Sequence, residues 1–394
     1  MPLNYPQLQP QIQKLGENAV HRENRLQALL EKADEILDSR AEDVDALRAK
    51  VERAAASKES LRCAFPIKEP LNAAYPCPEM PSEATLLAVD GSQINPDHHA
   101  AIDYYLVNVG GILLHLDGDD APETFLETQL KYGDDMYTKS RRVTSGDVAL
   151  ERDLAERRYL AQWAGKYMAK NAPEDTLVTL TDGPLELWGA GDPEIGRELD
   201  AYLESLETLT RLGAIPAGYV DDPQADLVVR LLEVAQLEEN DLSQAGRVRP
   251  FRGVSDVGLF TSRLEPGERS AVFGIQSQTR VKYPDHLQLC FFYLNVGDAG
   301  NPWLARVEIP VWVGEDIAKI QALHAVLIQQ CQILGTQAYP YLLHRSHEIA
   351  VVSHEENQLL TDMIRQERWN RRLPVEQTSH KQLLKDQPGR SRIK

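Results

Sequence analysis

A short apolar run that ends in Asp-Gly-Ser places the strongest constraint on the fold of this chain. The run spans residues 85–92, where Leu86 to Val89 precede Asp90 and Gly91. An apolar run of this length after a proline-rich stretch predicts a buried β-strand. We expect Asp90 at the C-terminal end of that strand and a backbone turn at Gly91, which has no side chain to clash.

A second copy of the pattern lies further along the chain. Residues 176–184 form another apolar run, and this run ends in Asp182, Gly183 and Pro184. Two parallel strands that each end in a carboxylate bring both carboxylates to one edge of a sheet. Oxygen ligands of this kind suit a hard divalent cation. Asp-Gly alone is common in turns, so the prediction depends on both motifs in their order.

The order of the predicted elements favours a ribonuclease H-like core. Two apolar stretches that flank Gly110 and Gly111 predict a β-hairpin, and Asp147 is a candidate cap for the helix that follows. The elements are, in chain order, strands 85–90, 103–109 and 112–116, helix 147–170, strand 176–182, helix 194–212 and strand 214–220. This β-β-β-α-β-α-β order predicts an α/β fold with a mixed sheet of the ribonuclease H-like class.

A core of this class carries a further acid on its first helix. Glu151, Asp153 and Glu156 are the acidic candidates, and helical spacing directs them to different faces. We select Glu156 as the third ligand because it shares a face with Arg152, four residues earlier.

The remaining sequence divides the chain into four segments. An apolar stripe at three- and four-residue steps predicts the N-terminal helix, and five prolines mark the connector after it. Three further strand patterns make the C-terminal half β-rich. The predicted segments are a helical arm (1–62), a proline-rich connector (63–83), the main domain (84–352), and a C-terminal helix with a basic tail (353–394).

Composition limits the classes of protein and the compartment. The net charge of −18 argues against a protein that coats nucleic acid by charge alone, although bound metal ions would invert the local sign. No apolar stretch reaches the roughly 20 residues of a membrane span. The four scattered cysteines fit neither a zinc site nor a disulfide framework, and no signal-peptide pattern is present. We therefore expect a cytoplasmic protein that does not contact membranes.

The spaced motifs together resemble the NurA nuclease family. They are Ala88-Val89-Asp90-Gly91-Ser92, Arg152-x-x-x-Glu156, Thr181-Asp182-Gly183-Pro184-Leu185, and Tyr339-Pro340 followed by His347. The stretches 251–273 and 291–297 resemble the bacterial branch of that family. The likeness covers most of residues 84–352.

The resemblance implies a ribonuclease H-like fold and a homodimer. It implies a Mn²⁺- or Mg²⁺-dependent DNA nuclease that is a 5′-to-3′ exonuclease and a single-strand endonuclease. The family's acidic ligands fall on Asp90, Glu156 and Asp182, and its C-terminal tyrosine and histidine on Tyr339 and His347. The implied partner is a HerA-type hexameric ATPase that acts with the nuclease in DNA end resection and double-strand break repair.

The two-metal hypothesis assigns a role to each of these residues. Asp90 would bridge two divalent ions, and Glu156 and Asp182 would each hold one. His347 would hold the scissile phosphate or assist a proton transfer, and Tyr339 would orient the phosphate or the water.

Several alternatives stay open. Pro184 stands where the family commonly has serine, and the gap between Glu156 and Asp182 is longer than in archaeal members, so Glu151 is an alternative ligand. A different ATPase or a role in phage defence is an alternative to HerA and repair. Two other functions compete with the DNA nuclease: a non-catalytic clamp or adaptor for a DNA-translocating ATPase, and a related metal-dependent enzyme that cuts RNA.

Overall fold

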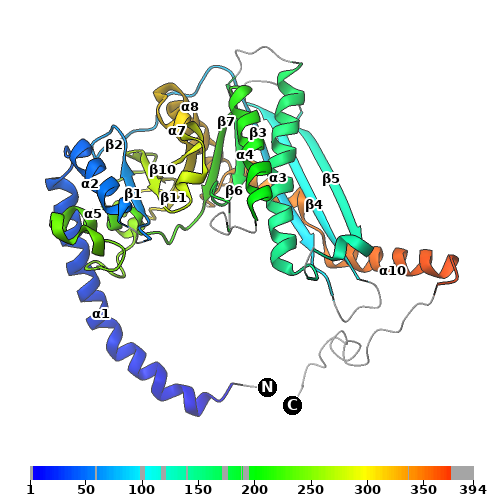
Figure 1. The fold of residues 1–394 in the computed structure, drawn as a ribbon, viewed down its shortest axis with the longest axis horizontal. Coiled ribbons are helices and arrows are strands. Elements are labelled where there is room, and N and C mark those ends of the chain that lie inside the picture. The colour runs from blue at the N-terminus through cyan, green and yellow to red at the C-terminus, as the bar shows by residue number, and fades with distance from the viewer. Residues whose placement is uncertain are drawn as a thin grey trace. The chain divides into compact units, whose positions relative to one another are not determined.

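The computed structural model describes most of the chain and divides it into two compact units. The described residues are 3–57, 60–97, 103–116, 121–138, 141–170, 176–187, 189, 195–335 and 337–373. The first unit comprises residues 1–81, 183–186 and 215–340, and the second comprises 82–182, 187–214 and 341–394. Figure 1 labels most of the elements of the two units.

The second unit contributes four strands of a mixed sheet of the ribonuclease H-like class. The strand order is β6-β3-β4-β5, in which β3 is parallel to β6 and antiparallel to β4. Its elements are β3 (Ala84–Ile94), β4 (Tyr104–His115), β5 (Glu123–Tyr132), α3 (Ser145–Met168), β6 (Thr176–Asp182), α4 (Gly196–Arg211), α9 (Tyr341–Ala350) and α10 (His354–Asn370). The mixed α/β class that the sequence predicts is therefore confirmed.

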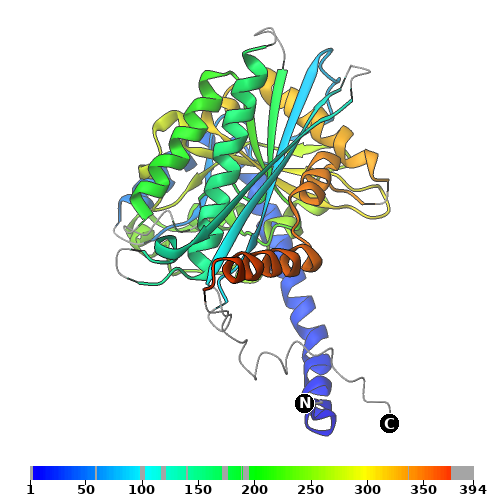
Figure 2. The ribbon, with the colours of Figure 1, turned by 90° about the vertical axis from the view of Figure 1, so that its right-hand side faces the viewer.

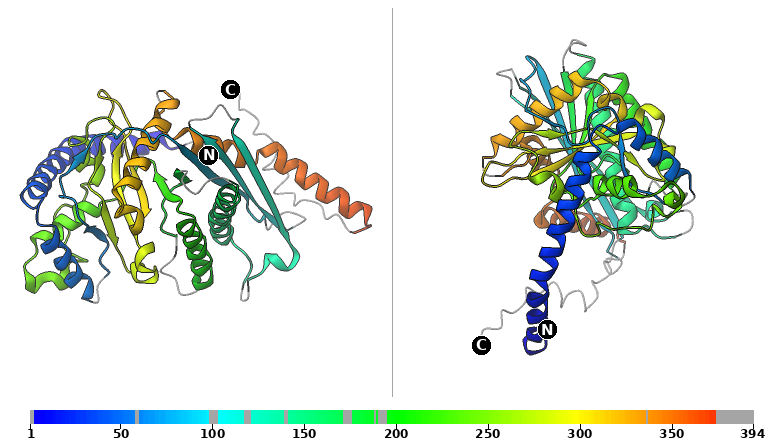
Figure 3. Two further views of the ribbon diagram at one scale, coloured as in Figure 1. Left: turned by 90° about the horizontal axis from the view of Figure 1, so that it is seen from above. Right: turned by 90° about the vertical axis from the view of Figure 1, so that its left-hand side faces the viewer.

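Helices cover both faces of this sheet. Helices α3 and α4 run side by side over one face, and α9 and α10 lie on the other (Figures 2 and 3). A buried apolar cluster, which includes Leu87, Val89, Val109 and Trp163, joins α3 to β3 and β4. Burial of these side chains is the main force that holds α3 on the sheet.

The predicted hairpin at Gly110 and Gly111 is wrong. Both glycines are extended residues inside one long strand, β4, and each lies under a helix. A Cβ at Gly111 would be 2.3 Å from the Trp163 ring, and a Cβ at Gly110 would be 2.5 Å from the backbone nitrogen of Ala350. The pair therefore allows α3 and α9 to approach opposite faces of one strand.

The third strand of the core is β5, which lies between the predicted strand 112–116 and the predicted helix 147–170. Most of its residues are exposed, so the burial pattern that marks the other strands is weak here. Helix α3 begins close to the predicted residue, but its cap is Thr144. Asp147 is the third helical residue, and its carboxylate accepts a hydrogen bond from the Thr144 backbone N–H, which completes a capping box.

The strands of the first unit pair with one another in antiparallel fashion. Their order is β1-β9-β10-β11-β7, with β8 paired to β10 and to β2. The strands are β1 (Cys63–Pro66), β2 (Ala74–Tyr75), β7 (Ile215–Val220), β8 (Arg269–Ser270), β9 (Phe273–Gln276), β10 (Leu289–Asn295) and β11 (Leu304–Pro310). The helices are α1 (Tyr5–Ser39), α2 (Val44–Ala56), α5 (Leu227–Gln236), α6 (Asp256–Thr261), α7 (Val311–Gly314) and α8 (Ile317–Ile333).

The N-terminal helix predicted within the arm of residues 1–62 is two helices, α1 and α2. The C-terminal turns of α1 bury Ala33 and Leu37 and pack on α5 and α6 of the same unit. Arg263 holds this end of the helix through hydrogen bonds of 2.8 Å to both carboxylate oxygens of Asp38. The four segment boundaries drawn from the sequence stay a prediction, and the basic tail falls outside the described residues.

Among the helices that the structure describes, none is long and apolar enough to span a membrane.

Gly111 provides a test of the close helix approach. We expect Gly111→Ala to lower the free energy of unfolding by about 1–3 kcal/mol, because its methyl group would overlap the buried Trp163 ring. Gly146→Ala is the matched control, since a Cβ there would lie 3.7 Å from the nearest atom, an ordinary contact. Urea denaturation followed by tryptophan fluorescence measures both variants. Equal stability of the two would contradict this packing.

Candidate active site

Asp90 lies inside β3, which continues to Ile94, so the expected turn at Gly91 does not occur. One carboxylate oxygen of Asp90, Oδ1, accepts a hydrogen bond of 2.8 Å from the Gly91 backbone N–H. The other, Oδ2, lies 2.6 Å from Nδ1 of His347. Because a carboxylate accepts hydrogen bonds, this contact places the ring proton on Nδ1. Sequence motifs far apart in the chain are thus joined directly.

The helix that carries His347 is held against β3 and β4. Asn108 donates to the backbone oxygen of Ala350 at 2.7 Å, and the Ser92 hydroxyl donates to the same oxygen at 2.5 Å. Gly110 provides the space for this end of α9. Fixed in this way, α9 presents His347 to Asp90.

Gly91 brings Glu156 against the strand. A Cβ at Gly91 would lie 2.5 Å from Oε1 of Glu156 and 2.7 Å from Cγ of Arg152. The absence of a side chain in the Asp-Gly motif therefore makes room for the α3 carboxylate. Arg152 Nε lies 3.2 Å from Oε1 of Glu156, as the four-residue spacing predicts.

The Glu156 carboxyl group is deeply buried, with 7% of its side chain exposed. Burial raises its pKa to about 8, an effect that Asp153 and Asp90 increase and that Arg157 and Arg152 oppose. A cation beside Glu156 would stabilise its ionised form.

Asp182 occupies the position next to Asp90 on the neighbouring strand. Val89 pairs with Thr181 in the parallel register of β3 and β6, so Asp90 and Asp182 are the next residues in each strand. Here the predicted strand end is confirmed: Asp182 is the last residue of β6, and Gly183 follows with φ +84°. A positive φ of this kind favours glycine.

The acids nevertheless approach β3 from different sides. Side chains alternate along a strand, so Gly91 faces α3 and its neighbour Asp90 faces α9. In the described parts of the chain, no three His, Cys, Asp or Glu side chains are grouped to hold one metal ion. The structure therefore joins Asp90 to His347 and Glu156 to the adjoining backbone, without a closed three-ligand cage.

Two other candidates have different surroundings. Glu151 accepts a hydrogen bond of 2.6 Å from the Tyr105 hydroxyl and lies 3.8 Å from Nζ of Lys131. It therefore links α3 to side chains of β4 and β5. Tyr339 belongs to the first unit, where its ring packs edge-on against Tyr219 with ring centres 5.6 Å apart.

The sequence pattern placed Arg152 and Glu156 on one face of the helix. It did not predict that both side chains lie against Gly91, because Gly91 was interpreted as a turn residue.

The strand order, the crossing helix and the acids of β3, α3 and β6 together define a ribonuclease H-like α/β protein. The NurA domain model matches residues 84–352. This match covers more than half of the chain, which therefore belongs to the NurA family. No curated relative matches the sequence.

Three solved structures resemble the chain at low sequence identity. The NurA nuclease from Sulfolobus solfataricus is 12% identical with a TM-score of 0.48, and the match covers 85% of this chain and 97% of that one. The catalytic domain of human Endonuclease V is 13% identical with a TM-score of 0.32, over 71% and 84% of the two chains. Ciona intestinalis Endonuclease V in complex with DNA is 11% identical with a TM-score of 0.29, over 71% and 87%.

The raised pKa of Glu156 predicts a pH dependence of stability. The unfolded carboxyl group ionises near pH 4.5 and the folded one near pH 8, so between these values the folded state binds more protons. Stability therefore falls as pH rises through this range, by up to about 1.4 kcal/mol per pH unit. Glu156→Gln cannot ionise and should remove this component of the slope.

Urea denaturation in EDTA across this pH range measures the effect. Glu355→Gln, at an exposed position on α10, is the control and should follow the wild type. If Glu156→Gln and wild type have parallel profiles, the carboxyl group of Glu156 is not desolvated in the way the structure indicates.

Proposed function

We propose that this protein is a metal-dependent nuclease that hydrolyses phosphodiester bonds of DNA. The observation that carries the proposal is the buried Glu156 carboxylate against Gly91, directly beside Asp90 in β3. An acid this deeply buried is expensive to ionise, and Arg152 and Arg157 offset only part of that cost, since the pKa of Glu156 is still raised. Membership of the NurA family agrees with a nuclease.

The chemistry of the donors fits Mn²⁺ or Mg²⁺. Asp90, Glu156 and Asp182 offer carboxylate oxygens, which these hard cations prefer. Gly91 leaves a space that any side chain would fill, so the Glu156 carboxylate reaches the backbone next to Asp90. A bound divalent ion would supply positive charge that activates water and stabilises the leaving oxygen.

The protein's own residues would orient the scissile phosphate and transfer protons near it. Asp90 fixes the His347 ring through Nδ1, which leaves Nε2 as the basic nitrogen of the neutral ring. His347 is largely exposed, so Nε2 is accessible to water or phosphate. Arg152 partly balances the charge of Glu156, and Tyr339 is proposed to orient the phosphate or the water.

The finer expectations belong to the same proposal. They are two ions per site, 5′-to-3′ polarity, a homodimer, a HerA-type ATPase partner, DNA end resection as the process, and a cytoplasmic location. A clamp or adaptor for a DNA-translocating ATPase is the competing function, and it would bind DNA without cutting it.

Asp90→Asn tests the proposed nuclease. We expect wild type to cut 5′-labelled single-stranded DNA with Mn²⁺ and to stop in EDTA, because the ion supplies charge that the acids alone lack. Asp90→Asn should lower the rate at least about 10²-fold, since it removes both a ligand and the partner of His347. The amount of product formed over time, resolved on denaturing gels, gives the rate.

Glu355→Gln is the control, and it should cut at the wild-type rate. A fully folded Asp90→Asn variant that still cuts at that rate would refute the assignment of Asp90. DNA binding by wild type without any cleavage would instead favour the adaptor. Cleavage of RNA but not DNA would favour the related metal-dependent enzyme that cuts RNA.

A further inference from the structure

The four residues after Asp182 have surroundings that the proposed mechanism does not use. Gly183–Glu186 form a short stretch that clusters with the first unit, while Asp182 before it and Leu187 after it belong to the second. Successive Cα atoms are only about 3.8 Å apart. Whatever fixes this stretch therefore fixes the backbone of Asp182 as well.

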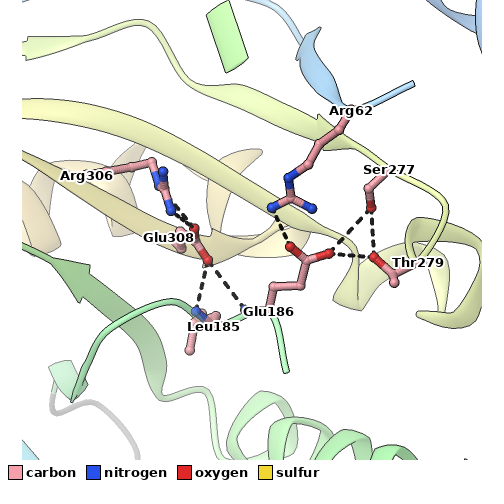
Figure 4. Close-up of polar contacts among 7 residues, drawn as sticks. All are labelled: Arg62, Leu185, Glu186, Ser277, Thr279, Arg306 and Glu308. Carbon is pink, nitrogen blue, oxygen red and sulfur yellow. Dashed lines mark hydrogen bonds and ion pairs between the residues drawn. The ribbon is translucent and has the colours of Figure 1, made fainter. Parts of the chain in front are cut away.

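Glu308 on β11 holds the stretch from one side. Its side chain is 1% exposed, and Oε2 accepts hydrogen bonds from two successive backbone N–H groups, Leu185 at 2.9 Å and Glu186 at 3.4 Å. Oε1 accepts from Nε and a terminal nitrogen of Arg306, at 3.1 and 2.8 Å. Figure 4 shows the Glu308 carboxylate between the guanidinium and the backbone.

The side chain of Glu186 holds the stretch from the other side. It accepts hydrogen bonds of 2.5 Å from Arg62 and from the Thr279 hydroxyl, and one of 3.5 Å from Ser277 (Figure 4). Arg62 lowers the pKa of the Glu186 carboxyl group against the opposing effect of burial, so the group stays ionised. The carboxylates of Glu308 and Glu186 thus fix residues 183–186 by hydrogen bonds and an ion pair.

The first residue of the stretch is also fixed. Gly183 donates its backbone N–H to the oxygen of Tyr219 at 2.8 Å. A Cβ at Gly218 would be 2.6 Å from the Gly183 oxygen and 2.9 Å from the Leu185 nitrogen, so this stretch lies directly on the backbone of β7. The peptide group that joins Asp182 to Gly183 is therefore tied at its nitrogen.

We propose that Glu308 is a positioning residue for Asp182 and so for cation binding. Asp182 ends its strand, and no β6 residue beyond it extends the ladder with β3. The Glu308 carboxylate accepts two N–H groups of the backbone that follows Asp182. This inference rests on the proposed function, since it assumes that Asp182 is a cation ligand.

The chain offers a matched control for a purely structural role. Glu69 is paired with buried Arg269 and also accepts a backbone N–H, from Val272 at 2.8 Å. It belongs to the same unit as Glu308, but the backbone that it holds carries no proposed ligand. Loss of Glu69 should therefore affect stability alone.

The experiment measures Mn²⁺ binding to the full chain by calorimetry, without DNA. We expect Glu308→Gln to weaken binding about 10-fold, as loss of a residue that orients a metal ligand commonly does. Glu69→Gln should change the Kd by less than about twofold. In the Asp182→Asn background, Glu308→Gln should add no more than about twofold, because the ligand that it positions is already lost.

Two results would overturn the inference while leaving the proposed function intact. One is an equal Kd for Glu308→Gln and Glu69→Gln, when Asp182→Asn alone weakens binding. The other is a Glu308→Gln effect of full size in the Asp182→Asn background. If neither Asp90→Asn nor Asp182→Asn changes Mn²⁺ binding, the proposed metal site itself is refuted, and the inference with it.

A second variant tests the inference if Glu308→Gln fails to fold. Failure to fold is a risk because Glu308→Gln leaves Arg306 charged and buried. Arg306→Met/Glu308→Leu replaces the ion pair by apolar side chains, a change that buried pairs often tolerate. It still removes the acceptor of the Leu185 and Glu186 N–H groups. Thermal unfolding identifies the folded variants, and the same 10-fold loss of Mn²⁺ affinity is expected of this one.

Discussion

The close approach of α3 to β3 at Gly91 is the contact on which the candidate site depends. A helix normally stands off a sheet by the length of the side chains between them. Here the strand contributes only a hydrogen atom, so the Glu156 carboxylate and the Arg152 stem reach the backbone. The apolar cluster of α3, β3 and β4 holds the helix at this distance, and the unfavourable burial of Glu156 is tolerated because that cluster is large.

The same device appears twice more in the unit, at Gly110 and Gly111. In each case a glycine that pattern-based reasoning assigns to a turn is an extended residue under a helix. This explains which predictions were wrong. The glycines of the Asp-Gly and Gly-Gly pairs were interpreted as turn residues because glycine has a flexible backbone. In β3 and β4 they matter because they have no Cβ, which lets a helix approach the strand. Which of the two applies depends on the helix that packs there, and local sequence does not contain that information.

Other features followed from the sequence because they are local. Apolar runs located β3 and β6 and the two halves of β4, and the predicted helices 147–170 and 194–212 correspond to α3 and α4. The spacing of Arg152 and Glu156 was enough to select the buried acid, since a four-residue step fixes a common face. Strand β5 escaped because an edge strand with two exposed faces has little apolar pattern. The family resemblance placed Asp90 and His347 in one site, but their direct contact was not predicted, because 257 residues separate the two.

The two aspartates differ in how their backbones are held, although their motifs look alike. Asp90 is paired with Gly110 across β4, and its strand continues for four residues, so the ladder itself fixes the Asp90 backbone. Asp182 has no strand after it, and a strand end would fray without other partners. The contacts of Gly183 with Tyr219 and of Glu308 with the next two N–H groups supply these partners from β7 and β11. Glu308 thus holds the backbone that follows Asp182, and the proposed role of Asp182 as a cation ligand gives the buried Arg306–Glu308 pair a function besides stability, since burial of such a pair costs desolvation free energy.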